Sequence, residues 1–249
     1  MSPRLAFAID AALAAGKATL AHFQVPTKVE IKPDQSPVTV ADREAESLIR
    51  KAIAQNFPGE GILGEEEGES TGDGRWVIDP IDGTKSFVAG VPLYATLLSF
   101  ERDSKVEIGV CYFPALNELL YAEKSKGAFW NGRPCRASAR PALEGGIIAT
   151  GSAASLAREN RLAGVQRIEK KVMASRTWSD AYGHALVATG RVEAMIDPII
   201  SHWDISAMSL IVREAGGKFT DFSGNEAFAN EALSSNSLVH EELVEAFKE

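Results

Sequence analysis

The sequence predicts a protein of the α/β (α+β) class, with helices packed in layers on β-sheets. Three observations lead to this expectation. Amphipathic helical patterns open the chain, short β-rich runs follow beyond Gly74, and strand and helix patterns alternate after Pro141. The chain has 249 residues, of which 45% are hydrophobic, so it is long enough to bury a sizeable core.

Two amphipathic helices are expected first. From Leu5 to Phe23, apolar residues recur three, four or seven positions apart, which places them on one helix face. A second helix is expected from Thr39 to Gln55, with Thr39 as its N-cap. Its inward-facing residues are predicted to be Ala45, Leu48, Ile49, Ala52 and Ile53.

A largely antiparallel sheet is expected under these helices. Short runs rich in β-branched and aromatic residues, separated by turn residues, predict its strands. These runs lie at 61–63, 76–78, 93–100, 106–113 and 118–122.

The second half of the chain predicts a smaller α/β layer. Strands are expected at 147–150, 172–174, 192–196 and 218–220, and helices at 155–163, 180–189 and 204–215. Pro141, Gly145 and Gly146 cluster between the two patterns. We therefore expect an N-terminal α+β part, residues 1–140, and a C-terminal α/β part, residues 141–249.

The composition argues against several classes of partner. The 34 acidic and 26 basic residues give a net charge of −8, so we expect neither a nucleic acid nor an anionic membrane as partner. Cys111 and Cys135 lack zinc-site spacing and are expected to be reduced thiols. The first twenty residues do not resemble a signal peptide, and we expect a cytoplasmic protein.

The most informative segment is Trp-Val-Ile-Asp-Pro-Ile-Asp-Gly-Thr at residues 76–84. Pro80 is expected to stop the strand and fix a turn that aims Asp79, Asp82 and the Ile81 carbonyl at one point. Oxygen ligands of this kind suit Mg²⁺. Taken alone, the two aspartates could be only a turn and a helix cap.

Three further features gain meaning beside this segment. Gly83 and Thr84 are expected to begin a helix whose free N–H groups point at an anion. Glu65 opens an acidic loop after a short strand, although such a run is usually a solvated surface. Asp204 opens an apolar helix, where it could be nothing more than an N-cap.

Together these segments resemble the inositol monophosphatase family of metal-dependent, lithium-sensitive phosphatases. The first signature matches residues 76–84, and the second resembles Trp-Asp-Ile-Ser-Ala-Met-Ser-Leu-Ile-Val-Arg-Glu-Ala-Gly-Gly at 203–217. The resemblance covers most of the chain. It implies the layered αβαβα sandwich of the inositol monophosphatase and fructose-1,6-bisphosphatase type, with the active site between its halves and a homodimeric assembly.

The resemblance also implies a metal site for two or three Mg²⁺ ions. Its ligands would be Glu65, Asp79, the Ile81 carbonyl, Asp82 and Asp204, and Asp79 would bridge two ions.

The same resemblance implies the groups that act on water and phosphate. Asp42 and Thr84, with the ligand Glu65, would be the catalytic residues, because Asp42 and Thr84 orient and deprotonate the attacking water. The backbone amides of Gly83 and Thr84 would hold phosphate oxygens.

Residues 176–184 and 188–191 resemble the histidinol-phosphate phosphatase branch of the family. In that branch Asp180 and Asp197 would bind the substrate, and Asp197 lies seven residues before Asp204. Two carboxylates suit a cationic alcohol such as histidinol better than a neutral polyol. The simpler alternatives are a helix N-cap for Asp180 and a strand-end turn for Asp197.

The resemblance therefore implies hydrolysis of histidinol phosphate, a step of histidine biosynthesis. Inositol 1-phosphate and a 3′-phosphonucleotide are alternative substrates, and a regulatory or binding relative without turnover is the alternative outside the enzymes. His184 could pair with Asp180 four residues earlier, and His202 is expected to pack beside Trp203. Neither histidine is assigned a catalytic role.

Overall fold

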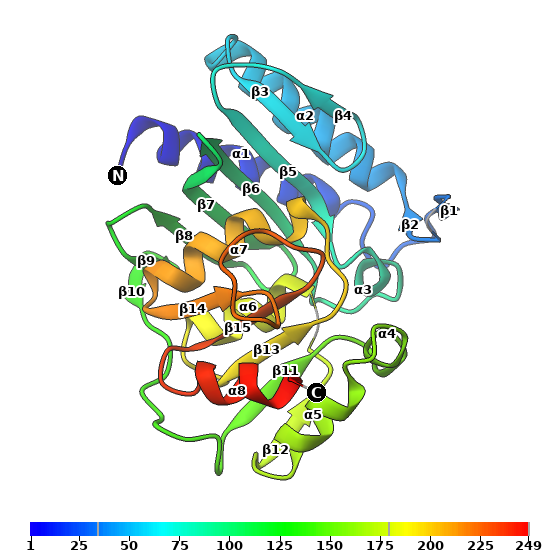
Figure 1. Cartoon of the computed structure of the whole chain (residues 1–249). Helices are drawn as coiled ribbons and strands as arrows, with labels where there is room; N and C mark the ends of the chain where they lie inside the picture. Colours follow the sequence, from blue (N-terminus) through cyan, green and yellow to red (C-terminus); the bar gives the residue numbers. More distant parts are fainter. Residues whose placement is uncertain (34, 179, 249) are drawn as a thin grey trace.

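In a computed structural model that describes residues 1–33, 35–178 and 180–248, helices and sheets alternate in stacked layers (Figure 1). The larger sheet has eight strands in the order β10-β9-β8-β7-β6-β5-β3-β4 among the described residues. Only its β3–β5 pair is parallel. These strands are β3 (Gly61–Gly64), β4 (Gly68–Ser70), β5 (Arg75–Asp82), β6 (Ala95–Arg102), β7 (Lys105–Phe113), β8 (Glu118–Glu123), β9 (Ala128–Trp130) and β10 (Arg133–Cys135).

The smaller sheet has five strands in the order β12-β11-β13-β15-β14 over the same described ranges. β11 runs parallel to β12 and β13, whereas β15 runs antiparallel to β13 and β14. Its strands are β11 (Ile147–Thr150), β12 (Ala174–Arg176), β13 (Ala194–Asp197), β14 (Gly217–Thr220) and β15 (Ala232–Asn236). A separate short hairpin joins β1 (Glu30–Ile31) and β2 (Pro37–Val38).

The helices form three layers around the two sheets, as Figure 1 shows. α1 and α2 pack on one face of the larger sheet, α6 and α7 lie between the sheets, and α4, α5 and α8 pack on the far face of the smaller sheet. The αβαβα sandwich predicted from the sequence is therefore confirmed. The helices are α1 (Pro3–Thr19), α2 (Val40–Asn56), α3 (Thr84–Val88), α4 (Ala153–Arg158), α5 (Leu162–Glu169), α6 (Asp180–Ala188), α7 (His202–Glu214) and α8 (His240–Phe247).

The expected helices and strands are found with several corrections. Helix α1 ends at Thr19 instead of Phe23, because the chain then forms tight turns and reaches Gln24, whose φ is 59°. The helix predicted at 155–163 is two helices, α4 and α5, separated at Asn160, whose φ is 57°. The strand predicted at 172–174 begins only at Ala174.

Helix α2 buries a different residue from the one expected. Leu48 was predicted to face inward, but it is 44% exposed, whereas Glu46 is completely buried. The carboxylate of Glu46 accepts hydrogen bonds from Arg50 and from the backbone N–H groups of Glu66 and Glu67. These donors compensate for the loss of hydration, so a charged residue occupies the inner face.

Strand β5 does not stop at Pro80, as the sequence predicted, but continues to Asp82. The pairing with β6 shifts register between Asp79, opposite Leu97, and Asp82, opposite Ala95. The carbonyl of Pro80 accepts a hydrogen bond of 2.9 Å from Thr96 Oγ1. A bulge therefore tolerates the proline, which has no N–H group to donate.

Several elements were not predicted at all: the hairpin β1–β2, the short strands β4, β9 and β10, and the C-terminal pair β15 and α8. The larger sheet ends at Cys135 and the smaller sheet begins at Ile147, but a single core cluster contains residues from both. The division into 1–140 and 141–249 stays a prediction.

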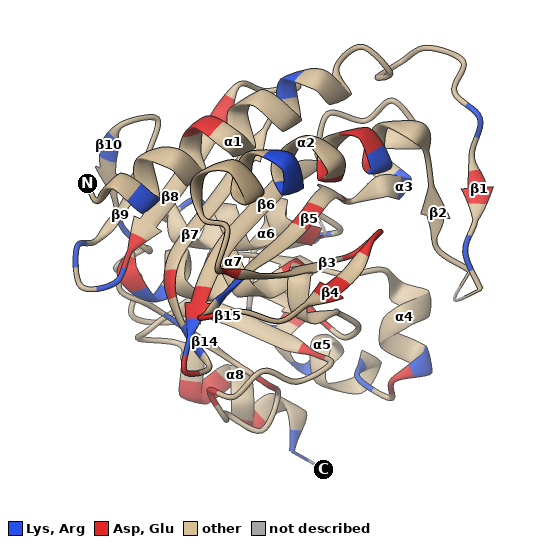
Figure 2. Cartoon of the chain, turned by 90° about the horizontal axis from the view of Figure 1, so that it is seen from above, with Lys and Arg blue, Asp and Glu red and all other residues tan. Residues whose placement is uncertain are grey.

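The charged residues and the helix lengths bear on possible partners. In Figure 2, Lys and Arg are interspersed with Asp and Glu over the elements in view. None of the helices in the described ranges combines the length and the apolar character needed to cross a lipid bilayer.

Candidate active site

The end of β5 places two buried carboxylates next to each other. Asp79 is 1% exposed and Asp82 is 6% exposed. The Ile81 N–H donates to Asp79 Oδ1 at 3.0 Å, which fixes one oxygen of that carboxylate. The Ala181 N–H, at the start of α6, donates to Asp82 Oδ2 at 2.7 Å. The bulge in β5 and the start of α6 thus orient the pair.

Helix α7 brings a third carboxylate to the same place. The helix begins at His202 and Ser201 is its N-cap, so Asp204 is not the N-cap that the sequence allowed. Asp204 lies at the third helical position, where its Oδ2 accepts a hydrogen bond of 2.7 Å from the Ser201 N–H. One carboxylate oxygen from each of Asp79, Asp82 and Asp204 lies within 4.8 Å of the other two.

The electrostatics of these three carboxylates, hereafter the metal cluster, favour a bound cation. Burial, followed by the charges of Glu65 and Asp82, raises the pKa of Asp79 well above its usual range. Burial and the nearby Asp180 charge raise the pKa of Asp82 in the same way. Burial raises the pKa of Asp204 to about 7. Because hard, convergent oxygen ligands suit divalent cations such as Mg²⁺, the residues fit the implied metal.

Glu65 has a basic partner that the sequence did not reveal. Lys32, in the loop of the β1–β2 hairpin, donates from Nζ to Glu65 Oε1 at 2.7 Å and to Glu66 Oε1 at 2.6 Å. Lys32 contacts Glu65 and not the metal cluster, and no Lys or Arg of the described residues forms an ion pair with the cluster.

The predicted catalytic pair, Asp42 and Thr84, is brought together. Asp42 is completely buried at the third position of α2, and its Oδ2 accepts from the Thr39 backbone N–H at 2.8 Å and from Thr39 Oγ1 at 2.6 Å. Its Oδ1 lies 3.4 Å from Thr84 Oγ1, which also donates to the Ile81 carbonyl at 3.0 Å. Burial raises the pKa of Asp42, which suits a proton acceptor.

Gly83 and Asp180 meet at the start of two helices. Gly83 has a φ of 78° and caps α3. A Cβ atom at this position would lie 3.1 Å from Asp180 Oδ2 and 3.2 Å from the Leu93 carbonyl oxygen, so a side chain would crowd both. Glycine therefore allows the carboxylate of Asp180 to approach the α3 backbone. The adjacent Ser179, part of the segment that suggested the substrate, lies outside the described residues.

Most predicted site residues line one cavity of about 140 Å³. Asp42 and Asp197 are not among its described lining residues. Asp197 ends β13, is 8% exposed, and has its pKa raised by burial and by the charges of Asp180 and Asp204. The lining residues are Ser36, Pro37, Glu65, Asp79, Ile81, Asp82, Gly83, Thr84, Lys85, Asp180 and Asp204.

Three of these lining residues, Ser36, Pro37 and Lys85, were missed from the sequence. Lys85 could have been found, because it directly follows the predicted phosphate-binding amides of Gly83 and Thr84. Nothing in the sequence marks Ser36 and Pro37, since the hairpin that carries them was not predicted.

The two histidines have structural contacts. His184 Nδ1 hydrogen-bonds Ser234 Oγ at 2.7 Å, and burial lowers the pKa of His184 to about 3, so the ring is neutral. The packing expected for His202 is found against Phe228, at a ring distance of 4.4 Å. His202 also hydrogen-bonds Glu101 at 2.7 Å, a contact that the sequence did not predict.

Comparisons with known proteins find similar sequences and structures. The model of the inositol monophosphatase family matches residues 1–249. A histidinol-phosphatase of Chlorobaculum parvum is 42% identical over 99% of this chain and 97% of its own length. A fructose-1,6-bisphosphatase/inositol-1-monophosphatase of Thermotoga maritima is 40% identical over 99% and 96%. The crystal structure of the extragenic suppressor protein suhB of Bartonella henselae superposes with a TM-score of 0.94 at 33% identity, covering 100% of this chain and 99% of that one.

Proposed function

The chain belongs to the inositol monophosphatase family of metal-dependent phosphatases, and from this premise we propose that it hydrolyses histidinol phosphate to histidinol and phosphate. Hydrolysis of a small phosphomonoester follows from the family itself. The choice of histidinol phosphate, and of Mg²⁺ as the ion in two or three copies, is the proposal.

The observation that carries the choice of substrate is the position of Asp180. It lines the same cavity as the metal cluster but is not one of the three clustered carboxylates. Asp180 can therefore contact the alcohol part of the substrate. Histidinol carries an ammonium group and an imidazole, and hydrogen bonds between charged groups are about twice as strong as those between neutral groups. The name of the Chlorobaculum relative supports the same substrate.

The size of the cavity supports a small alcohol. About 140 Å³ is available beside the metal cluster, whereas pockets for drug-sized ligands usually measure about 300 to 1,000 Å³. A phosphate with a short, compact alcohol fits this space better than a nucleoside does. The observation concerns the part of the ester that lies inside the cavity, beside the metal cluster.

The proposed mechanism gives each side chain one task. Bound divalent ions supply positive charge that stabilises the transition state and favours ionisation of water. The metal cluster, Glu65 and the Ile81 carbonyl would hold these ions. Thr84 Oγ1 accepts a proton from the attacking water and passes its own proton to Asp42 Oδ1, 3.4 Å away. As the water oxygen bonds to phosphorus, the P–O bond to the alcohol breaks, and the alcohol oxygen takes a proton from solvent water.

Substrate binding completes the mechanism. The backbone N–H groups of Gly83 and Thr84 hold the phosphate oxygens. Asp180 and Asp197 bind the cationic alcohol, Asp180 from the cavity wall and Asp197 from the end of β13. Asp197 is not among the described residues that line the cavity, so its contribution is expected to be mainly electrostatic.

Two other functions stay in competition. Inositol 1-phosphate is favoured by the name of the Thermotoga relative. A regulatory or binding role is favoured by the suppressor-protein name of the Bartonella structure. The complete set of carboxylates around the cavity supports turnover over binding alone.

A phosphate-release assay with Mg²⁺ separates these functions. It compares histidinol phosphate, inositol 1-phosphate, a sugar phosphate and 3′-phosphoadenosine phosphate at equal concentrations. We expect the highest kcat/KM for histidinol phosphate. A higher value for inositol 1-phosphate would contradict the proposed substrate and leave the phosphatase activity intact, whereas no release from any ester would favour a binding role.

The assembly and compartment belong to the same proposal. We propose a homodimer that acts in the cytoplasm. Light scattering coupled to size-exclusion chromatography should give twice the monomer mass of 26.7 kDa. A mass of 26.7 kDa would show that the protein is a monomer.

A further inference from the structure

A second carboxylate with its own set of partners lies beside helix α7. Glu101, near the end of β6, is 2% exposed. Its Oε1 accepts hydrogen bonds from His202 Nε2 at 2.7 Å and from Ser206 Oγ at 2.6 Å. Arg75 Nε donates to its Oε2 at 3.0 Å. We call Glu101, Arg75, His202 and Ser206 the helix anchor.

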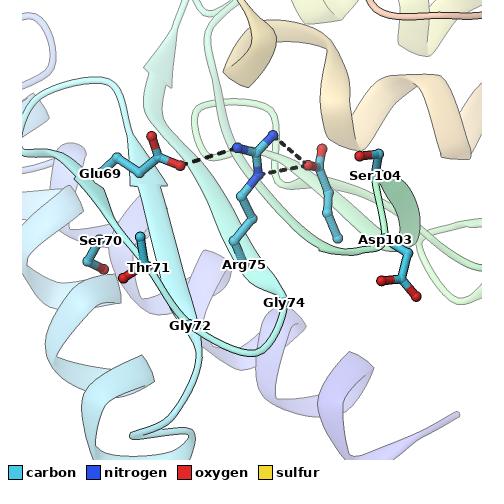
Figure 3. Close-up of a pocket in the computed structure, with 9 residues that line it drawn as sticks. Glu69, Ser70, Thr71, Gly72, Gly74, Arg75, Asp103 and Ser104 are labelled. Carbon is cyan, nitrogen blue, oxygen red and sulfur yellow. Dashed lines mark hydrogen bonds and ion pairs between the residues drawn. The ribbon is translucent and has the colours of Figure 1, made fainter.

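The helix anchor is reached from a surface pocket of about 320 Å³. Figure 3 shows Arg75 between two carboxylates, and the labelled one is Glu69. Arg75 Nη1 lies 3.3 Å from Glu69 Oε1, and the Glu69 side chain is 54% exposed. Arg75 therefore has one buried partner that contacts α7 and one exposed partner, Glu69, which pairs with it from β4.

Within the helix anchor, Glu101 contacts one face of the first turns of α7. His202 and Ser206 are four residues apart, so they lie on the same face of the helix. Asp204 lies midway between them, about 200° around the helix axis from each, and so projects from the opposite face. Glu101 on one face and the metal cluster on the other therefore share a short stretch of helix.

Strand β6 connects this helix to the other two members of the metal cluster. The backbone of Leu97 pairs with Asp79, and that of Ala95 pairs with Asp82. Farther along the same strand, Glu101 holds Ser206 on α7. Ser99 Oγ, also on β6, lies 2.6 Å from Ser206 Oγ. One strand thus fixes all three carboxylates relative to one another.

We propose that Glu101 is a positioning residue that holds α7 so that Asp204 lies at the distance from Asp79 and Asp82 that a divalent cation requires. This inference rests on the proposed role of Asp204 as a metal ligand. A carboxylate near the start of α7 also interacts favourably with the helix dipole, which adds to its hold on the first turn. Small displacements of a ligand matter because Mg²⁺ demands nearly ideal octahedral geometry.

The test compares Glu101→Gln with Glu69→Gln, since both remove a negative charge next to Arg75 and only Glu101 contacts α7. Isothermal titration calorimetry of metal-free protein with Mg²⁺ measures binding directly, and thermal unfolding measures stability. Loss of a residue that orients a metal ligand typically lowers metal affinity about 10- to 100-fold. We expect a roughly tenfold higher Kd for Glu101→Gln and an unchanged Kd for Glu69→Gln.

A purely structural role for Glu101 predicts a different result. The Tm of Glu101→Gln would fall while the Kd of the folded protein for Mg²⁺ stayed that of the wild type, and this outcome would overturn the inference. If Glu101→Gln does not fold, Ser206→Ala removes one contact of the helix anchor and keeps the charge of Glu101. A Kd for Ser206→Ala equal to that of the wild type would also overturn the inference.

Asp204→Asn separates this inference from the proposed site. Weaker Mg²⁺ binding in Asp204→Asn with unchanged binding in Glu101→Gln would refute only the positioning role. Unchanged binding in Asp204→Asn would refute the ligand role of Asp204, and the positioning role with it. Weaker binding in both variants, with Glu69→Gln unchanged, is the expected result.

Discussion

Two groups with buried carboxylates lie on opposite faces of the first turns of α7: the helix anchor, with Glu101, and the metal cluster. Their carboxylates differ in the partners that surround them. Glu101 is bound by Arg75, His202 and Ser206. Burial alone would raise the pKa of Glu101, but the hydrogen bonds from His202 and Ser206 outweigh burial and lower this pKa. In the metal cluster, by contrast, burial raises the pKa of all three carboxylates, and the charges of nearby carboxylates add to this increase.

The difference shows how a binding site can be told from a structural network of the same residue type. Two carboxylates about 4 Å apart repel by roughly 4 kcal/mol at an effective dielectric constant of 20. The helix anchor offsets the buried charge with donors from the protein itself. Each carboxylate of the metal cluster accepts one backbone N–H, but no Lys or Arg of the described residues pairs with the cluster, so folding leaves a repulsion that a bound cation or a proton relieves.

The largest expected effect distinguishes the two groups by activity. Asp79→Asn removes the proposed bridging ligand, and the loss of several kcal/mol of charge stabilisation should lower kcat by about 10³-fold or more. Without metal the same change relieves repulsion, so the unfolding free energy should rise by about 1 kcal/mol. Phosphate release and urea unfolding in EDTA measure the two effects. A metal-free variant less stable than the wild type would contradict the comparison.

Asp42 shares features with both groups. Like Glu101, it has one oxygen bound by donors from the protein, Thr39 in this case, whereas its other oxygen faces Thr84 in the proposed active site. Asp42→Asn should lower kcat by about 10²- to 10⁴-fold, the usual contribution of a general base. The Kd for Mg²⁺ should stay close to that of the wild type. Loss of Mg²⁺ binding with normal kcat at saturating metal would assign Asp42 to the metal site instead.

A smaller effect concerns substrate selectivity. Asp180→Asn should lower kcat/KM for histidinol phosphate by about ten- to a hundredfold, since a hydrogen bond to a charged group contributes roughly 1.5 to 3 kcal/mol. Turnover of p-nitrophenyl phosphate, which has no cationic group, should change little. Asp197→Asn should show the same selectivity with a smaller loss, because Asp197 does not line the cavity. Equal losses on both substrates would assign the residue to the metal site or the fold.

Apart from activity, the stability contributed by the two groups should depend on pH with opposite signs. Between the ordinary Asp pKa of 3.8 and about 7, the unfolded chain releases a proton that folded, metal-free protein keeps on Asp204. Stability should therefore fall as the pH rises through this range. The pKa of Glu101 is lowered, so its contribution is present above the ordinary pKa of 4.5 and is lost as the pH falls below it.

Urea unfolding of metal-free protein at a series of pH values measures both contributions. Asp204→Asn should reduce the loss of stability between pH 4 and 7. Glu101→Gln should leave that loss in place and reduce the loss on the acidic side. A wild-type slope for both variants would show that the pH dependence comes from other groups.

The parts of the site that the sequence predicted are local. Residues 76–84 carry Asp79, Asp82, Gly83 and Thr84 on one short segment, so their proximity follows from the chain itself. Asp204 was found because a second signature marks it. The bulge that carries β5 past Pro80 was not predicted, because it depends on pairing with β6.

The features that the sequence could not predict depend on distant segments. Lys32 meets Glu65 only because an unpredicted hairpin lies over the acidic loop. Glu46 is buried because loop amides and Arg50 bind its carboxylate, whereas helical periodicity favours an apolar residue such as Leu48. Polar burial of this kind is decided by tertiary partners, which hydrophobic patterns do not contain.

The order in which the segments are synthesised has a consequence for assembly in the cell. Glu65, Asp79 and Asp82 leave the ribosome long before Asp204, because α7 follows far along the chain. Until α7 has emerged, the proposed metal site lacks Asp204, its last carboxylate. Glu101 also lacks its hydrogen-bond donors His202 and Ser206, which lie on the same helix. We expect the nascent chain to capture magnesium late, once α7 has docked between the sheets.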